Sequence, residues 1–122
     1  MEHQVILHND DGDNDNYSGY VEIKLKLDDL KIKWTITDCG CYPSSKWIEL
    51  LNYMKEQPTD QRSPIISGGG NSSWFTDVNK TNFRLIFDIS GNGGDSTIIY
   101  KFPIDKMIPV VEQIIEKIKL ME

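Results

Sequence analysis

Apolar and polar residues alternate along much of the chain, with the period of two that is typical of a half-buried β-strand. The clearest alternation spans residues 20–27 and resumes at Leu30. Asp28 and Asp29 stand between the two runs, and a two-residue connection is typical of an antiparallel hairpin. Residues 4–8 are also predicted to form a short first strand. We therefore predict three strands in the first third of the chain.

A second pattern follows the 3.6-residue period of an amphipathic helix near the end of the chain. Apolar residues spaced three and four apart form one stripe at Ile104, Met107, Ile108, Val111, Ile114, Ile115 and Ile118. Pro109 is compatible with a helix only near its first turn. We therefore predict that the regular helix begins as late as Ile108.

The middle of the chain combines both patterns. Pro43-Ser44-Ser45 is typical of a helix start, and Pro58 ends the helix that follows. The apolar stripe of this helix consists of Trp47, Leu50, Leu51 and Met54. Ile65-Ile66 predicts a short strand, residues 67–73 a turn, and residues 74–78 another strand.

The last two strands are predicted on either side of Asn92-Gly93, a pair that favours a hairpin turn. In the first of them the apolar face consists of Phe83, Leu85, Phe87 and Ile89. The order of elements is therefore three strands, a helix, about four strands and a second helix.

This order predicts an α+β fold in a single domain that spans residues 1–122. Each half is an antiparallel meander followed by a helix. A helix cannot bury its apolar stripe alone, so we expect antiparallel sheet on one side with both helices packed against it or across it.

Composition narrows the class of protein. A chain of 122 residues can bury a core without metal or disulfide support. Its net charge of −6 disfavours general attraction to nucleic acid or anionic membranes and favours a soluble monomer or a basic partner. No apolar run approaches the ~18 residues of a membrane span, and the N-terminus lacks the basic start of a signal peptide. We predict a cytoplasmic protein that contacts no membrane.

The first hairpin gathers four lysines on its polar face. Its two-residue turn places Lys26 opposite Lys31 and Lys24 opposite Lys33. Like charges in this position are mildly destabilising unless an acidic group covers them. The face suits an anion or single-stranded nucleic acid, although Trp34 lies on the opposite side of the hairpin. The alternative interpretation is a solvated face, partly neutralised by a neighbouring strand.

Residues 9–16 form the most acidic stretch, and their spacing resembles a calcium-binding loop. The positions that would hold the ion are Asp11, Asp13, Asp15, Tyr17, Gly19 and Glu22. Asn16 stands where such a loop needs glycine, and strands rather than helices flank the stretch. A solvated acidic loop, or an acidic patch for a basic partner, fits these flanks better.

Other candidate sites have weaker support. Cys39 and Cys41 lack the spacing of a zinc or redox pair, and His3 and His8 have opposite parity on one strand, so they cannot point at the same metal ion. No lysine and serine follow Gly68-Gly69-Gly70 as a phosphate-binding loop requires. No histidine is placed to serve as a base for a serine or cysteine nucleophile. We therefore predict no enzyme activity and no cofactor.

In size, charge and layout the chain resembles the immunity proteins of bacterial contact-dependent inhibition and other polymorphic-toxin systems. These proteins bind and block a cognate toxin domain, often a nuclease. One group of them is similar in layout to the Whirly fold, which repeats a four-stranded meander and a helix. The resemblance implies a cytoplasmic inhibitor whose partner is a toxin.

Charge suggests where such a toxin would bind. Nuclease domains tend to have basic clefts, and an acidic inhibitor gains association rate and specificity from the complementary potential. The predicted contact residues are Asp10, Asp11, Asp13 and Asp15, with Tyr17 and Tyr20 as aromatic anchors. Two alternatives remain open, namely a nucleic-acid-binding module that uses Lys24, Lys26, Lys31 and Lys33, and a binding module stabilised by calcium at Asp11, Asp13, Asp15 and Glu22.

Overall fold

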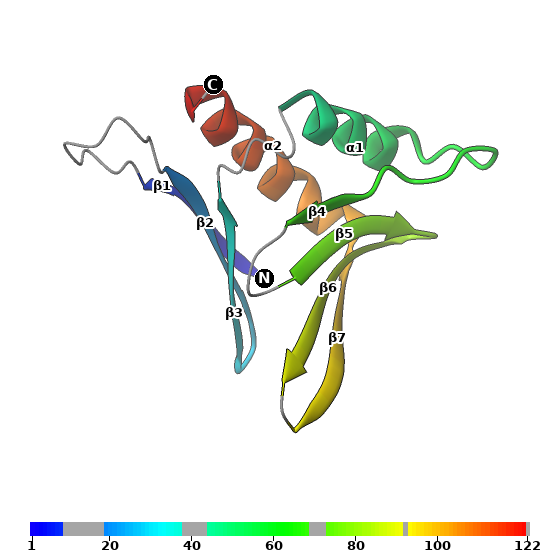
Figure 1. The fold of residues 1–122 in the computed structure, drawn as a ribbon. Helices are drawn as coiled ribbons and strands as arrows, with labels where there is room; N and C mark the ends of the chain where they lie inside the picture. Colours follow the sequence, from blue (N-terminus) through cyan, green and yellow to red (C-terminus); the bar gives the residue numbers. More distant parts are fainter. Residues whose placement is uncertain (9–18, 38–43, 69–72, 92, 122) are drawn as a thin grey trace.

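The fold is α+β, with two antiparallel sheets and two helices in the described parts of the chain (Figure 1). The computed structural model describes residues 1–8, 19–37, 44–68, 73–91 and 93–121. Its first sheet, sheet A, has the order β1-β2-β3. The strands of sheet A are β1 (Glu2–His8), β2 (Tyr20–Leu27) and β3 (Leu30–Thr37).

The second sheet, sheet B, has the order β4-β5-β6-β7, so each strand lies beside its neighbour in the chain. Its strands are β4 (Ile66–Gly68), β5 (Ser73–Asn79), β6 (Asn82–Gly91) and β7 (Gly94–Pro103). Tight turns join the last three strands. Lys80 adopts a positive φ of 57° in the turn between β5 and β6.

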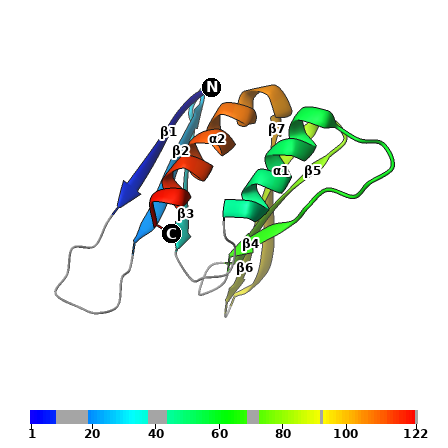
Figure 2. The same cartoon turned by 90° about the horizontal axis from the view of Figure 1, so that it is seen from above.

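The two sheets diverge, and the helices lie between them at the wide end (Figures 1 and 2). Helix α1 (Ser44–Glu56) packs against helix α2 (Ile104–Met121), and α2 also covers the inner face of β1. Buried residues of both sheets and both helices form one hydrophobic cluster. At its centre the rings of Trp34 from β3, Trp47 from α1 and Trp74 from β5 contact one another.

Several predictions from the sequence are confirmed. The order of elements is three strands, helix, four strands, helix. In the first hairpin Leu27 pairs with Leu30, and Asp28 supplies the positive φ of 49° that the tight turn needs. Helix α1 ends before Pro58: Gln57, with a φ of 47°, donates its N–H to the carbonyl of Tyr53 at 2.8 Å.

Other predictions were wrong in part. The strands form two separate sheets rather than one sheet layer. Ser67 and Gly68 belong to β4 and not to a turn, because they pair with Phe75 and Trp74 of β5. Ile89 was expected in the core but is 52% exposed, because the ends of β6 and β7 extend beyond the helices (Figure 1).

The predicted start of the last helix at Ile108 was also wrong. Helix α2 begins at Ile104 and contains Pro109 in its second turn. The N–H of Ile104 donates to the carbonyl of Thr81 at 3.3 Å, which ties the helix start to the β5–β6 turn. Ile104 and Met107 are both buried. Burial of these side chains therefore outweighs the one backbone hydrogen bond that Pro109 removes.

Candidate functional site

The candidate site is the outer face of sheet A, which points away from the helices. Because side chains alternate across a pleated strand, residues of the same parity on β2 share this face. The predicted pairing is confirmed: Lys24 lies opposite Lys33 and Lys26 lies opposite Lys31. Strand β1 adds Glu2 beside Lys26 and Gln4 beside Lys24. The sheet therefore carries two rows of directly opposed lysines.

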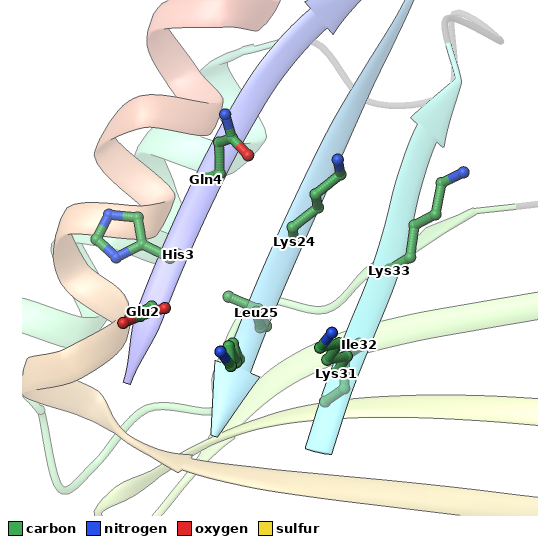
Figure 3. A pocket seen from close by; sticks show the side chains of 9 residues that line it. Glu2, His3, Gln4, Lys24, Leu25, Lys31, Ile32 and Lys33 are labelled. Carbon is green, nitrogen blue, oxygen red and sulfur yellow. The ribbon is translucent and has the colours of Figure 1, made fainter. Parts of the chain in front are cut away.

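These rows border an open hollow of about 700 Å³. It is lined by Glu2, His3, Gln4, Lys24, Leu25, Lys26, Lys31, Ile32 and Lys33. Figure 3 shows Lys24 and Lys33 side by side on β2 and β3, and Lys31 nearer to the turn between them. Four ammonium groups around one hollow produce a local positive potential that favours an anionic ligand or partner.

Glu22 explains how one of the two opposed lysine pairs, Lys24 and Lys33, is tolerated. It is only 7% exposed although it lies on the outer face, between Ile6 of β1 and Thr35 of β3. Its carboxylate lies 3.2 Å from Nζ of Lys33 and 3.6 Å from Nζ of Lys24. The acidic group that the Lys24–Lys33 pair requires is therefore supplied by β2 itself.

The same contacts shift the acidity of Glu22. A hydrogen bond from Lys33 lowers the pKa of the Glu22 carboxyl, with burial opposing it, and the positive charges of Lys33 and Lys24 lower it further. Nε2 of His8 lies 3.6 Å from Oε1 of Glu22, beyond hydrogen-bond distance, and its proximity lowers the pKa of Glu22 as well. Glu22 is therefore held as an anion in a cluster of cationic side chains.

The other end of this face is aromatic. His8 pairs with Tyr20, and their rings stack with centroids 4.6 Å apart and an interplanar angle of 15°. Tyr20 is 36% exposed. Residues 9–18 lie outside the described residues, so the predicted contacts Asp10, Asp11, Asp13, Asp15 and Tyr17 do too. The chain leaves the sheet after His8 and returns at Tyr20, so these aspartates are attached to the stacked end.

The net charge of −6 is distributed unevenly along the chain. All thirteen Lys and Arg residues are among the described residues, and thirteen Asp and Glu residues balance them. The six remaining carboxylates belong to Asp10, Asp11, Asp13, Asp15, Asp38 and Glu122. The described scaffold is therefore neutral in total, and four of the six excess negative charges lie between His8 and Tyr20.

The structure does not favour the calcium alternative. Three of its ligand positions, Asp11, Asp13 and Asp15, lie outside the described residues. The fourth, Glu22, already contacts two ammonium groups, which a metal ion would have to displace. Among the residues that the structure describes, no three His, Cys, Asp or Glu side chains are grouped closely enough to hold a metal ion.

The two histidines that were considered as metal ligands do not lie together. His3 lies on the inner face of β1, with its Nε2 3.3 Å from Nε2 of Gln113 in α2, whereas His8 lies on the outer face. The two histidines therefore point away from each other, as their parity predicted. Cys39 and Cys41 lie outside the described residues.

Sequence reasoning missed an ion pair on the outer face of sheet B. Nε and Nη2 of Arg84 donate to the two carboxylate oxygens of Asp77 at 2.7 Å and 2.6 Å, and this contact raises the pKa of Arg84. The sequence did contain a signal for this ion pair, because a two-residue turn at Lys80-Thr81 pairs Asp77 with Arg84.

Comparison of the chain with protein-family models, with curated proteins and with solved structures found no match. Over the part of the chain that is described, none of the helices has the length and apolar character required to cross a membrane. The function is therefore inferred from the residues of this chain.

Proposed function

We propose that this protein is an immunity-type inhibitor that binds a cognate bacterial toxin domain in the cytoplasm, without catalysis of its own. Its contact surface is the outer face of sheet A together with the acidic segment attached to it. A nuclease is the kind of toxin that this surface fits best, because nuclease clefts are basic and the acidic segment complements them.

One observation carries the proposal: the outer face of sheet A is polarised along its strands. Lys26 and Lys31 lie near one end, beside the Asp28-Asp29 turn, and the His8–Tyr20 stack lies at the other, about 20 Å from Lys26 for six residues of strand. The segment with Asp10, Asp11, Asp13 and Asp15 is attached at the stacked end. The chain thus supplies cationic groups on the sheet and anionic groups in the segment that joins β1 to β2.

This polarity favours a folded protein over a uniform polyanion. A nucleic acid that follows the strands would meet Asp28 and Asp29 at the turn, then the lysines, and then the attachment point of four aspartates. A protein partner can present charges of both signs in the matching order, which gives specificity as well as attraction. Tyr20 between the two regions provides an exposed aromatic side chain of the type that anchors interfaces.

The order of helices and strands also supports the assignment to the immunity-protein class. The order of three strands, helix, four strands and helix is similar to the Whirly-like layout of one group of immunity proteins. The first half has one strand fewer than that layout among the described residues.

The test is co-expression of the tagged protein with the product of the adjacent open reading frame, followed by titration of the purified pair. We expect a tight one-to-one complex that blocks the toxic activity. Changing Asp10, Asp11, Asp13 and Asp15 to lysine should weaken binding at low salt by at least ~10-fold and reduce its dependence on salt.

A matched control reverses four exposed carboxylates elsewhere, namely Glu56, Asp60, Glu112 and Glu116. It changes the net charge by the same amount and should leave affinity within ~3-fold of the parent. Equal losses in the two variants would show that only total charge matters, and the proposed contact surface would then be wrong.

The lysine hollow supports a second candidate function, the binding of single-stranded nucleic acid. It predicts that a fluorescent oligonucleotide binds at about 0.15 M salt and is released when Lys24, Lys26, Lys31 and Lys33 become glutamate. The matched control changes the exposed residues Lys55, Lys80, Lys106 and Lys119 instead. Equal effects of the two variants, or no binding by the parent, would exclude this function.

A further inference from the structure

Strand β7 is the longest exposed strand edge among the residues that the structure describes. Its ten residues pair with β6 on one side, and no described strand pairs with the other side. Pairing with β6 is continuous from Pro103 to Gly94, so no bulge twists the edge away. A long, regular edge is a template for another strand, because every second residue directs its backbone N–H and C=O groups outward.

The edge also carries exposed apolar side chains on both faces. Ile98 is 37% exposed on the inner face, where the neighbouring Phe87 and Tyr100 rings meet edge to face. Ile99 is 50% exposed on the outer face. Soluble proteins usually protect such edges with a central charge or proline, and residues 96–100 contain neither.

The structure points to a second copy of this chain as the occupant of the edge: we propose that two copies pair antiparallel through β7 and join their four-stranded sheets into one. A two-fold axis perpendicular to the sheet keeps the inner faces of both copies on the same side of the joined sheet. Such an axis places one residue of β7 directly opposite the same residue of the second copy. The residue on the axis is Ile98.

In this register the charged residues of β7 in one copy lie opposite residues of opposite charge in the second copy. With Ile98 opposite Ile98 of the second copy, Asp95 lies opposite Lys101, and the symmetry produces this pair twice. Thr97 then lies opposite Ile99, and Ser96 opposite Tyr100. Centring the pair on Ile99 would instead place Asp95 opposite Pro103, and centring it on Thr97 would place Asp95 opposite Ile99. Only the Ile98 register matches the charges.

Sedimentation equilibrium of the full chain over about 1–500 μM tests the proposal. The parent should form dimers within this range. The single variants Asp95→Lys and Lys101→Asp each oppose like charges twice and should weaken dimerisation about tenfold. The double variant, which exchanges the two charges, should restore it.

Asp95 and Lys101 are both exposed, so the single and double variants are expected to fold, which circular dichroism checks. A parent that stays monomeric throughout the range overturns the proposal and leaves the edge to a strand from another protein. A dimer that both single variants leave unchanged, or that the double variant fails to restore, overturns it as well. Ile98→Lys provides an independent readout, because it places two ammonium groups together on the axis and should abolish dimers.

Discussion

Lys24 and Lys33 lie directly opposite each other on β2 and β3, and both ammonium groups contact the same carboxylate, that of Glu22. An opposed lysine pair repels, and Glu22 converts the repulsion into a three-residue cluster on an otherwise open face. The cluster links the lysine hollow, which Lys24 and Lys33 line, to the His8–Tyr20 stack, whose His8 lies 3.6 Å from Glu22. It is therefore the point at which the two regions of the proposed contact surface join.

The stability of the protein is expected to depend on this carboxylate in acid. The pKa of Glu22 is lowered from its ordinary value of 4.5 by folding, so its contribution is complete above pH 4.5 and is lost as the pH falls further through the folded value. Glu22→Gln removes the contribution. Urea denaturation at pH 7, 5, 4 and 3 should show a gap between parent and variant that narrows only below about pH 4.5.

The matched control for this prediction is Glu49→Gln. Glu49 contacts Lys46 at 3.5 Å, but both side chains are well exposed, so the pair contributes little. A Glu22→Gln gap that stays constant from pH 7 to pH 3 would mean that the lysine contacts do not govern the titration of Glu22.

Gly68 provides a test of the core. A Cβ atom at this position would overlap the indole nitrogen of Trp74, which the three-tryptophan cluster holds in place. Gly68→Ala should therefore lower the free energy of unfolding by about 1–3 kcal/mol, as overpacking does. Gly91→Ala is the control, because a Cβ atom there would meet no other atom within 4 Å. Equal effects of the two substitutions on thermal unfolding would contradict the packing described.

Pro109 is expected to limit the stability of α2. It is exposed and cannot donate to the carbonyl of Asp105, one helical turn earlier. Pro109→Ala restores that donor and should raise the free energy of unfolding by about 1 kcal/mol or more. Pro109→Gly should raise the free energy of unfolding by about 1 kcal/mol less than Pro109→Ala does, because glycine is a poor helix former. Destabilisation by the alanine variant, measured by urea denaturation, would show that the proline is needed.

Asp28 tests the turn that sets the lysine register. Its φ of 49° is tolerated by aspartate and asparagine but is strained for a β-branched residue. Asp28→Val should cost about 1–2 kcal/mol, whereas Asp28→Asn should be close to neutral. If both variants unfold at the same urea concentration as the parent, backbone strain at this turn is not limiting.

Local rules in the sequence determined the elements and their pairing. The two-residue turn at Asp28-Asp29 places Lys24 opposite Lys33 whatever the rest of the chain does, because the side-chain period of a strand is two. The stripe from Ile104 to Ile118 likewise determined which face of α2 is buried. The acidic segment that the proposed function requires is also visible in the sequence alone.

Tertiary packing decided the rest. Alternation cannot reveal that β1 to β3 and β4 to β7 form separate sheets, because both arrangements bury the same alternate residues. Nor can it reveal that Ile89 and Ile98 lie beyond the reach of the helices, or that burial of Ile104 and Met107 carries α2 through Pro109. Pairing and periodicity act between near neighbours in sequence. Burial depends on which distant segments meet, and only the folded chain determines that.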